Sequence, residues 1–338
     1  MSRRRHIALL PLVVAVVMTA CGEGTAPVTE SGAADAMTTS SAAIEPTPDA
    51  SVATTVVPSD TDTTGGQLVD DDFPSSSYLG DYTLTDEEFG TEVSVSVTDG
   101  VRRITANALP NHETGDFPNA GNPNTITAQQ AEWTFPVEPV WTGVATWAQV
   151  PGVAINGVKF EPETAETVEC ATGQTYRIEA LQQVYDLGFD VNNAHVQPNG
   201  EYHYHGISAL MVEAFNGTDA DLVHIGFAAD GHLVMYSKSG ALRSGYALVT
   251  ARRTGSDCQP SLRNTTPIDL EGTDPDGTYV SDWEWSADNG DLDECNGTTT
   301  DGAYVYIVTD EYPFIGRCLK GESTATAPAG PGGGGQRP

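Results

Sequence analysis

The hexapeptide Glu201-Tyr202-His203-Tyr204-His205-Gly206 alternates tyrosine and histidine with a period of two. Successive side chains of a β-strand point to opposite faces, so this period predicts a strand with both histidines on one face and both tyrosines on the other. Same-face neighbours on a strand lie roughly 6 to 7 Å apart, and imidazole nitrogens bind zinc at about 2.0 to 2.1 Å. One metal ion could therefore bridge His203 and His205.

A third ligand is available a few residues upstream, at His195. The intervening Gln197-Pro198-Asn199-Gly200 is typical of a tight turn, which would fold His195 back towards the other two histidines. The expected site is therefore His195, His203 and His205, and three imidazoles suit zinc or copper. The alternative is an amphipathic strand whose tyrosines pack inward while its histidines face water or bond to the backbone.

More distant residues could add to this site. His112 lies in the turn-like Pro110-Asn111-His112-Glu113 and would complete a set of four ligands if the fold returns it to the strand; otherwise it is a loop histidine bonded to local backbone. Asp186 and Asp190 could bind the ion or orient a ligand imidazole, and helix-end and turn roles are equally open to them. An open coordination position could activate water, but nothing in the sequence identifies the general base that hydrolysis would need.

An acidic region near the C-terminus is a candidate for a different ion. Its carboxylates are hard oxygen ligands that could hold calcium. The spacing does not match an EF-hand loop and Pro275 interrupts it, so a solvated acidic loop is the favoured interpretation. The residues are Asp274, Asp276, Asp282, Asp288, Asp291, Asp293 and Glu294.

Alternation elsewhere predicts a mainly-β fold. Residues 92–98 read Glu-Val-Ser-Val-Ser-Val-Thr, the turn Asp99-Gly100 follows, and residues 101–106 complete a hairpin. Many short strands separated by Gly, Asp, Asn and Pro indicate one sandwich- or barrel-like domain with one or two short helices. Residues 176–188 are the clearest helix candidate, because Ile178, Leu181 and Tyr185 recur at helical spacing. Further strands are expected at 143–148, 154–160, 201–205, 222–228, 233–237, 279–285 and 302–308.

The N-terminal residues have the composition of a bacterial lipoprotein signal. Three arginines, an apolar run over 7–20 and the lipobox-like Met18-Thr19-Ala20-Cys21 predict export over residues 1–21, with lipid attached to Cys21. Residues 22–77 read as a disordered Ala/Thr/Ser/Asp/Glu-rich linker, 78–321 as the folded domain and 322–338 as a disordered Gly/Pro-rich tail. The expected location is the cell envelope, with the lipid anchor in the membrane, and the alternative is ordinary secretion.

The charge and the cysteine content indicate which partners and which covalent bonds to expect. The net charge of −32, from 15 basic and 47 acidic residues, makes nucleic acid an unfavourable partner. With Cys21 assigned to lipid, four cysteines remain, and an exported protein is expected to join them in two disulfides. Three connectivities are possible; Cys295 with Cys318 and Cys170 with Cys258 is favoured, because the first pair closes a short loop. A thiolate metal site is the alternative, but no CxxC spacing is present.

Several segments together resemble the YHYH domain, a bacterial family named for the four residues 202–205. The similarity covers roughly residues 101–321 and implies an extracytoplasmic domain whose histidines belong to the defining pattern; it implies no settled activity. Near the C-terminus, Tyr304-Val305-Tyr306-Ile307 has aliphatic residues where many members have histidines, so a second metal site there is not expected. The matching segments are Asn111-His112-Glu113, Asn119-Ala120-Gly121-Asn122-Pro123-Asn124, Ile155-Asn156-Gly157-Val158-Lys159-Phe160-Glu161-Pro162, Ala194-His195, Ala229-Asp230-Gly231, Leu292-Asp293-Glu294-Cys295-Asn296-Gly297 and Tyr312-Pro313-Phe314-Ile315-Gly316.

These features together favour a metal-binding surface protein over an enzyme. The alternatives are a metal-dependent hydrolase or oxidase that uses an open coordination position, and a structural or adhesive module with no metal. Protein partners are not predictable from the sequence.

Overall fold

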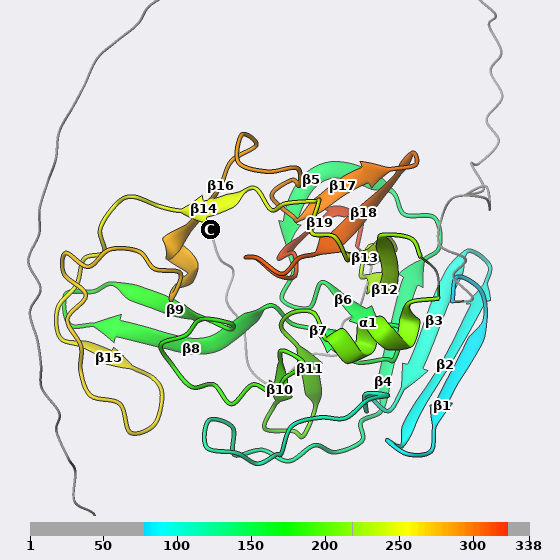
Figure 1. Ribbon diagram of the computed structural model, residues 1–338, viewed down its shortest axis with the longest axis horizontal. Coiled ribbons are helices and arrows are strands. Elements are labelled where there is room, and N and C mark those ends of the chain that lie inside the picture. Colours follow the sequence, from blue (N-terminus) through cyan, green and yellow to red (C-terminus); the bar gives the residue numbers. More distant parts are fainter. Residues whose placement is uncertain (1–77, 218, 324–338) are drawn as a thin grey trace, which may run out of the picture. The chain divides into compact units, whose positions relative to one another are not determined.

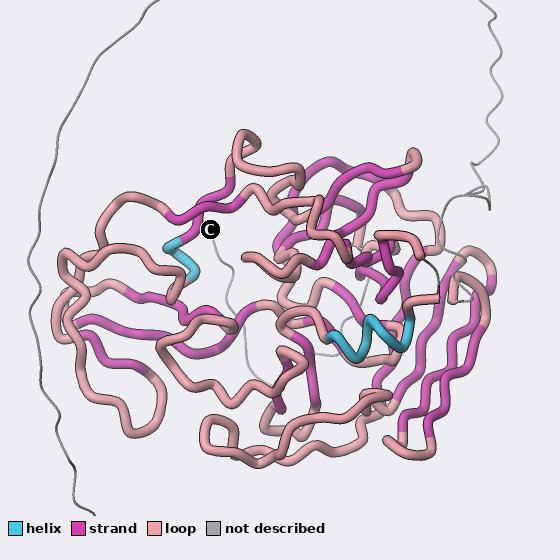
Figure 2. Tube along the Cα trace, in the orientation of Figure 1, coloured by secondary structure: helices cyan, strands magenta, loops and turns pink. Residues whose placement is uncertain are grey.

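The computed structural model describes residues 78–217 and 219–323, and in these ranges the chain is mainly β. Loops connect nearly all of the strands (Figure 2). The predicted fold class is confirmed, and the sheets are open, as in the sandwich-like form of the prediction. The strands are β1 Tyr82–Asp86, β2 Thr91–Thr98, β3 Val101–Ala106, β4 Ala131–Pro136, β5 Trp141–Trp147, β6 Gly152–Ala154, β7 Lys159–Phe160, β8 Glu163–Cys170, β9 Thr175–Glu179, β10 Ala194–Val196, β11 Tyr202–Tyr204, β12 Leu222–Ala228, β13 Leu233–Ser237, β14 Tyr246–Leu248, β15 Cys258–Pro260, β16 Trp283–Trp285, β17 Gly297–Thr300, β18 Ala303–Val308 and β19 Cys318–Gly321.

The predicted hairpin of residues 92–106 is part of an antiparallel four-stranded sheet in the order β1-β2-β3-β4. Val93, Val95 and Ile104 are buried while the residues between them face solvent, as the period of two requires. Asp99 and Gly100 turn the chain with positive φ of 55° and 72°, which is the conformation that a tight hairpin turn needs.

The largest sheet has eight strands in the order β10-β11-β7-β6-β12-β13-β18-β17. Figure 1 shows β11 beside β10. The β11–β7 pair is parallel and the β10–β11 pair is antiparallel. Tyr202 and Tyr204 are fully buried in the main hydrophobic core, which also takes in the inward face of the four-stranded sheet. The strand of the hexapeptide therefore lies inside the molecule, with both of its faces covered.

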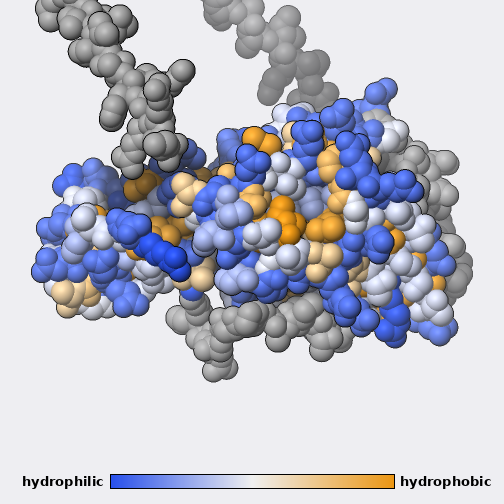
Figure 3. Space-filling model, turned by 90° about the horizontal axis from the view of Figure 1, so that it is seen from below, coloured by the Kyte–Doolittle hydropathy of each residue, from blue (hydrophilic) through white to orange (hydrophobic). Residues whose placement is uncertain are grey.

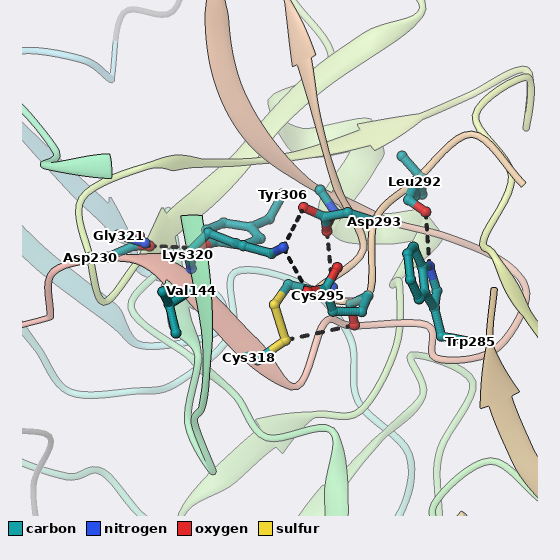
Figure 4. Close-up of a disulfide and its surroundings, with 12 residues drawn as sticks. Val144, Asp230, Trp285, Leu292, Asp293, Cys295, Tyr306, Cys318, Lys320 and Gly321 are labelled. Carbon is teal, nitrogen blue, oxygen red and sulfur yellow. Dashed lines mark hydrogen bonds and ion pairs between the residues drawn. A yellow bond between two sulfur atoms is a disulfide. The ribbon is translucent and has the colours of Figure 1, made fainter. Parts of the chain in front are cut away.

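Two disulfides join cysteines that are 88 and 23 positions apart in the sequence. Cys170 on β8 bonds to Cys258 on β15, its direct partner in the β15-β8-β9 sheet, and Cys295 bonds to Cys318 at the start of β19. This is the pairing that the sequence favoured. Near the second bond, Lys320 lies against Asp293 (Figure 4) and its ammonium is 2.7 Å from a carboxylate oxygen of Glu294. Closing loops of these lengths stabilises a fold by about 3 to 5 kcal/mol in the chain-entropy model.

The helix predicted at residues 176–188 is wrong. Residues up to Glu179 form β9, because Tyr176 and Ile178 pack on one apolar cluster as strand neighbours, and a loop over 180–193 follows. The α-helix is α1, Ala209–Phe215, which begins after Ser208, whose hydroxyl accepts a hydrogen bond from the Met211 amide. A short 3-10 helix, η1, spans Val280–Asp282.

Several predictions concern residues outside the described ranges. These are the signal over 1–21 with Cys21, the linker over 22–77 and all but the first two residues of the tail over 322–338. Within the described ranges, no helix has the length and apolar content needed to span a bilayer. On the face seen in Figure 3, hydrophilic residues prevail and apolar residues reach the surface in small areas among them.

Candidate metal centre

The hairpin β10–β11 brings the three predicted histidines together. His195 pairs directly with His203 across the two strands, and His205 follows on the same face, two residues beyond His203. The predicted turn is present, with hydrogen bonds between Gln197 and Glu201 and from the Gly200 amide to the Gln197 carbonyl. A two-residue spacing and one cross-strand pair thus place three imidazoles on one face of the sheet.

The three rings form a nearly equilateral triangle. The ring centroids are 4.7 Å apart for His195 and His203, 4.8 Å for His195 and His205, and 4.7 Å for His203 and His205. One ligand nitrogen from each ring lies within 4.8 Å of the other two, and Nε2 of His195 is 3.2 Å from Nε2 of His205. Two nitrogens bound tetrahedrally to one zinc ion are about 3.3 to 3.4 Å apart, so the observed separation suits a shared ion.

Hydrogen bonds to the backbone set the tautomers of two rings. Nδ1 of His195 donates to the Leu187 carbonyl at 2.9 Å, and Nδ1 of His203 donates to the Glu201 carbonyl at 3.2 Å. Each Nε2 consequently carries the free lone pair that a metal ligand needs.

His205 lacks a backbone partner of the kind that the other two rings have. Without an ion its Nε2–H would donate to Nε2 of His195, which would leave the Nδ1 lone pair buried and unpaired, a costly arrangement. With Nε2 turned to an ion, Nδ1 carries the proton instead. The Pro162 carbonyl favours the charged form of this ring, yet no hydrogen bond of normal geometry reaches Nδ1. Nδ1 of His205 therefore lacks a normal hydrogen bond in either state, and the fit of the three side chains to a metal ion rests on the convergence of their ligand nitrogens.

Burial keeps the imidazoles neutral. It lowers the pKa of His195, and it lowers the pKa of His203 and His205 well below the usual value. For the last two, repulsion from His195 and from the Lys159 ammonium acts in the same direction. Since metals bind the neutral ring, the site needs little deprotonation near neutral pH.

A buried ionic network lies beside the triangle on β7 and the residues that follow it. Lys159 is the parallel-strand neighbour of His203, and its ammonium lies 2.8 Å from Glu161, 3.1 Å from Glu201 and 3.0 Å from the Gln197 amide oxygen. The Glu161 carboxylate also accepts hydrogen bonds from Gln149 at 2.9 Å and from Gln197 at 2.7 Å. Two carboxylates share one ammonium, which leaves one surplus negative charge beside the triad.

The structure does not bring His112 to the other three histidines. It lies on the tyrosine face of β11, where its Nδ1 donates to the Glu113 carbonyl at 2.9 Å and its Nε2 accepts from the Tyr204 hydroxyl at 2.6 Å. Asn156 donates to the same hydroxyl at 2.9 Å. A buried tyrosine hydroxyl needs such partners, so the segment around His112 packs under the tyrosines, and the proposed fourth ligand is corrected to a structural role.

The aspartates considered as possible ligands have other partners. Asp190 accepts hydrogen bonds from the Tyr202 hydroxyl at 2.7 Å and the Gly115 amide at 3.0 Å, on the side opposite the histidines. Asp186 accepts from the Gly188 amide at 2.9 Å and has a turn role. In the acidic region, Asp282 binds the buried Arg253 guanidinium through both oxygens. Within the described ranges, the histidine triad is the group that could hold a metal ion.

Sequence reasoning missed two features of the centre. Lys159 and Glu161 are two residues apart and follow the site's own period, so alternation could have placed both on one face. Phe189, whose ring stacks on His195, had no such signal because it reaches the site from a loop. His224 and His232 lie outside the triad and bond to the carbonyls of Gly226 and Tyr304.

Comparison with known proteins places the three histidines within a family match. A family model described as YHYH protein matches residues 132–321, more than half of the chain, and this range includes all three histidines. No curated protein and no solved structure matches the chain. By its sequence over this range, the chain is a member of the YHYH family.

Proposed function

We propose that this protein is a lipid-anchored protein of the cell envelope that binds one transition metal ion through His195, His203 and His205. The observation that carries the proposal is the 3.2 Å separation of the His195 and His205 Nε2 atoms, within a triangle of rings in which backbone carbonyls set the tautomers of His195 and His203. Nitrogen atoms arranged in this way can bind one metal ion together.

Zinc and copper are the ions that this donor set favours. Imidazole nitrogen suits both, whereas calcium and magnesium prefer carboxylate and carbonyl oxygens. The calcium alternative loses support from the acidic region, because Asp276 and Asp282 bond to Arg253 and Asp274 bonds to Arg252.

Binding is favoured over catalysis by the state of the carboxylate on the β7 side of the triad. Glu161 is buried, and both of its oxygens are taken up by Gln149, Gln197 and Lys159. A general base must be free to accept a proton from water, so Glu161 does not supply one, and we rank a hydrolase or oxidase below metal binding.

The location in the cell envelope rests on the disulfides and on the export signal in the sequence. Disulfides persist in oxidising compartments, and a lipid on Cys21 would hold the chain at the membrane surface. Labelling with a fatty acid in cells is expected to mark the wild type and not Cys21→Ser, and membrane fractionation should lose the variant to the soluble fraction.

Metal analysis tests the binding site. Protein purified without an affinity tag is loaded with zinc or copper, dialysed and analysed by mass spectrometry. Wild type should retain about one ion per chain, whereas His195→Gln and His203→Gln should lose it, since two remaining imidazoles bind far more weakly.

His232→Gln is the matched control, because that ring is also buried and bonded to a backbone carbonyl but lies outside the triad. It should retain the metal. Equal metal content in wild type and both triad variants would contradict the proposal and favour a structural or adhesive module.

A further inference from the structure

We propose that the Phe189 side chain is a gate that controls exchange of the ion at the histidine triad. The inference rests on the proposed function. The Phe189 ring stacks on His195, with centroids 4.3 Å apart and planes at 13°, and meets the His205 ring edge-on at 4.8 Å and 73°. One apolar side chain thus contacts two of the three ligands.

Two other sides of the triad are closed. His203 and His205 are only 2% and 1% exposed, and His195 is the least buried of the three. The Lys159 and Glu161 network covers the side towards β7, and the opposite face of β11 is filled by tyrosines in the core. A chelator or an incoming ion therefore approaches by His195, where Phe189 lies.

The main chain on both sides of Phe189 is held in place. The Leu187 carbonyl accepts the hydrogen bond from His195, and the Gly188 carbonyl accepts one from Asn119 at 3.1 Å. Gly188 has φ 68° and packs so closely that an added Cβ would lie 2.4 Å from the Asn119 amide oxygen. On the other side, the Asp190 amide donates to the Ala194 carbonyl at 2.9 Å. Movement at this position is thus expected from the ring and not from the loop.

The Phe189 ring is expected to change the rates at which the ion binds and leaves more than the equilibrium affinity of the triad for the ion. Release of a bound ion to a chelator begins when a new ligand approaches, and the apolar ring excludes such ligands until it rotates away. Removing the ring leaves all three imidazoles and the carbonyl that orients His195. We expect Phe189→Ala to release the ion roughly 10- to 100-fold faster, the scale of outer-shell effects at metal sites.

The test is the rate at which EDTA removes Co²⁺ or Zn²⁺ from the loaded full chain, followed by stopped flow. Phe189→Ala should accelerate release strongly, and Phe189→Leu, which keeps bulk but cannot stack, should fall between this variant and wild type. A second readout is the visible spectrum of the Co²⁺ protein. Added azide should change it in Phe189→Ala and leave it unchanged in wild type.

Tyr185→Ala is the matched control. Tyr185 belongs to the same loop and the same apolar cluster, and its hydroxyl bonds to that of Tyr279 at 3.1 Å, but no ring contact joins it to the histidines. It should release the ion at the wild-type rate.

Each outcome separates the two proposals. If wild type binds the ion and neither Phe189 variant changes its release or its response to azide, the gate is wrong and the metal site stands. Loss of binding in a folded Phe189→Ala protein would make the ring a requirement for affinity and would also overturn the gate. If wild type itself binds no metal, both proposals fail.

Discussion

At the scale of single residues, the two faces of the hexapeptide strand have different roles. The histidines offer lone pairs to an ion, and the tyrosines donate hydroxyl hydrogen bonds inside the core. Tyr204 donates to His112 and accepts from Asn156, and Tyr202 donates to Asp190. A change on the tyrosine face should therefore affect stability without removing a metal ligand.

Replacing Tyr204 by Phe is expected to destabilise the fold by about 1 to 3 kcal/mol, because the change leaves buried polar groups of His112 and Asn156 without their partner. Denaturant unfolding measures this, and metal content should stay at the wild-type level. Tyr236→Phe is the control, since its hydroxyl bonds to the exposed Asp310 and its loss should change stability little. A Tyr204→Phe protein of full stability that had lost its metal would reverse our assignment of the two faces.

At the scale of elements, the turn between β10 and β11 sets the register that pairs His195 with His203. Gly200 in this turn has φ 87°, and an added Cβ would lie 2.0 Å from the Thr127 hydroxyl oxygen. Both the backbone conformation and the packing thus require glycine here.

Gly200→Ala should cost about 2 to 5 kcal/mol from the strained φ and the clash together, and it should weaken metal binding by shifting the hairpin. Gly100→Ala is the matched control, because Gly100 also has positive φ but has nothing within 4 Å of an added Cβ. It should cost about 1 to 2 kcal/mol and leave metal binding unchanged. Equal losses of stability and unchanged metal binding in both variants would show that the turn does not set the site.

Local sequence patterns predicted some of these elements correctly and others wrongly. Residues 92–106 form the predicted hairpin because alternation and the Asp99-Gly100 turn agree. Residues 176–188 mislead because Ile178, Leu181 and Tyr185 match a helical period by chance, while Tyr176 pairs with Val168 on β8 and Ile178 forms a β-bridge with Tyr279. Tertiary pairing overrides a weak local preference of this kind.

At the scale of the whole molecule, burial acts on every histidine in the described ranges. It lowers the pKa of His112, His195, His203, His205, His224 and His232, that of His224 to about 4. The unfolded chain binds these protons near pH 6.5, so it takes them up first as the pH falls. The contribution of these neutral histidines to the free energy of unfolding is fully present above about pH 6.5, and it is lost as the pH falls towards 4.

The metal-free protein should accordingly unfold at lower temperature as the pH is reduced from 7.5 to 4.5. His224 alone would contribute up to about 3 kcal/mol of this loss, because its ring is fully buried. Thermal unfolding by circular dichroism in the presence of a chelator measures the effect, and His224→Leu should flatten the profile. A melting temperature that rises on acidification would contradict this account.

The sequence by itself determined the features that depend on neighbours along the chain. A period of two places His203 and His205 on one face, a tight turn returns His195 to them, and alternating valines make the first hairpin. The tertiary structure alone decided that His112 bonds to Tyr204, that the Phe189 ring stacks on His195 and that Lys159 pairs with Glu161 beside the triad. The physical reason is that local geometry follows from backbone periodicity, whereas burial, charge pairing and ring contacts arise between segments that only the folded chain brings together.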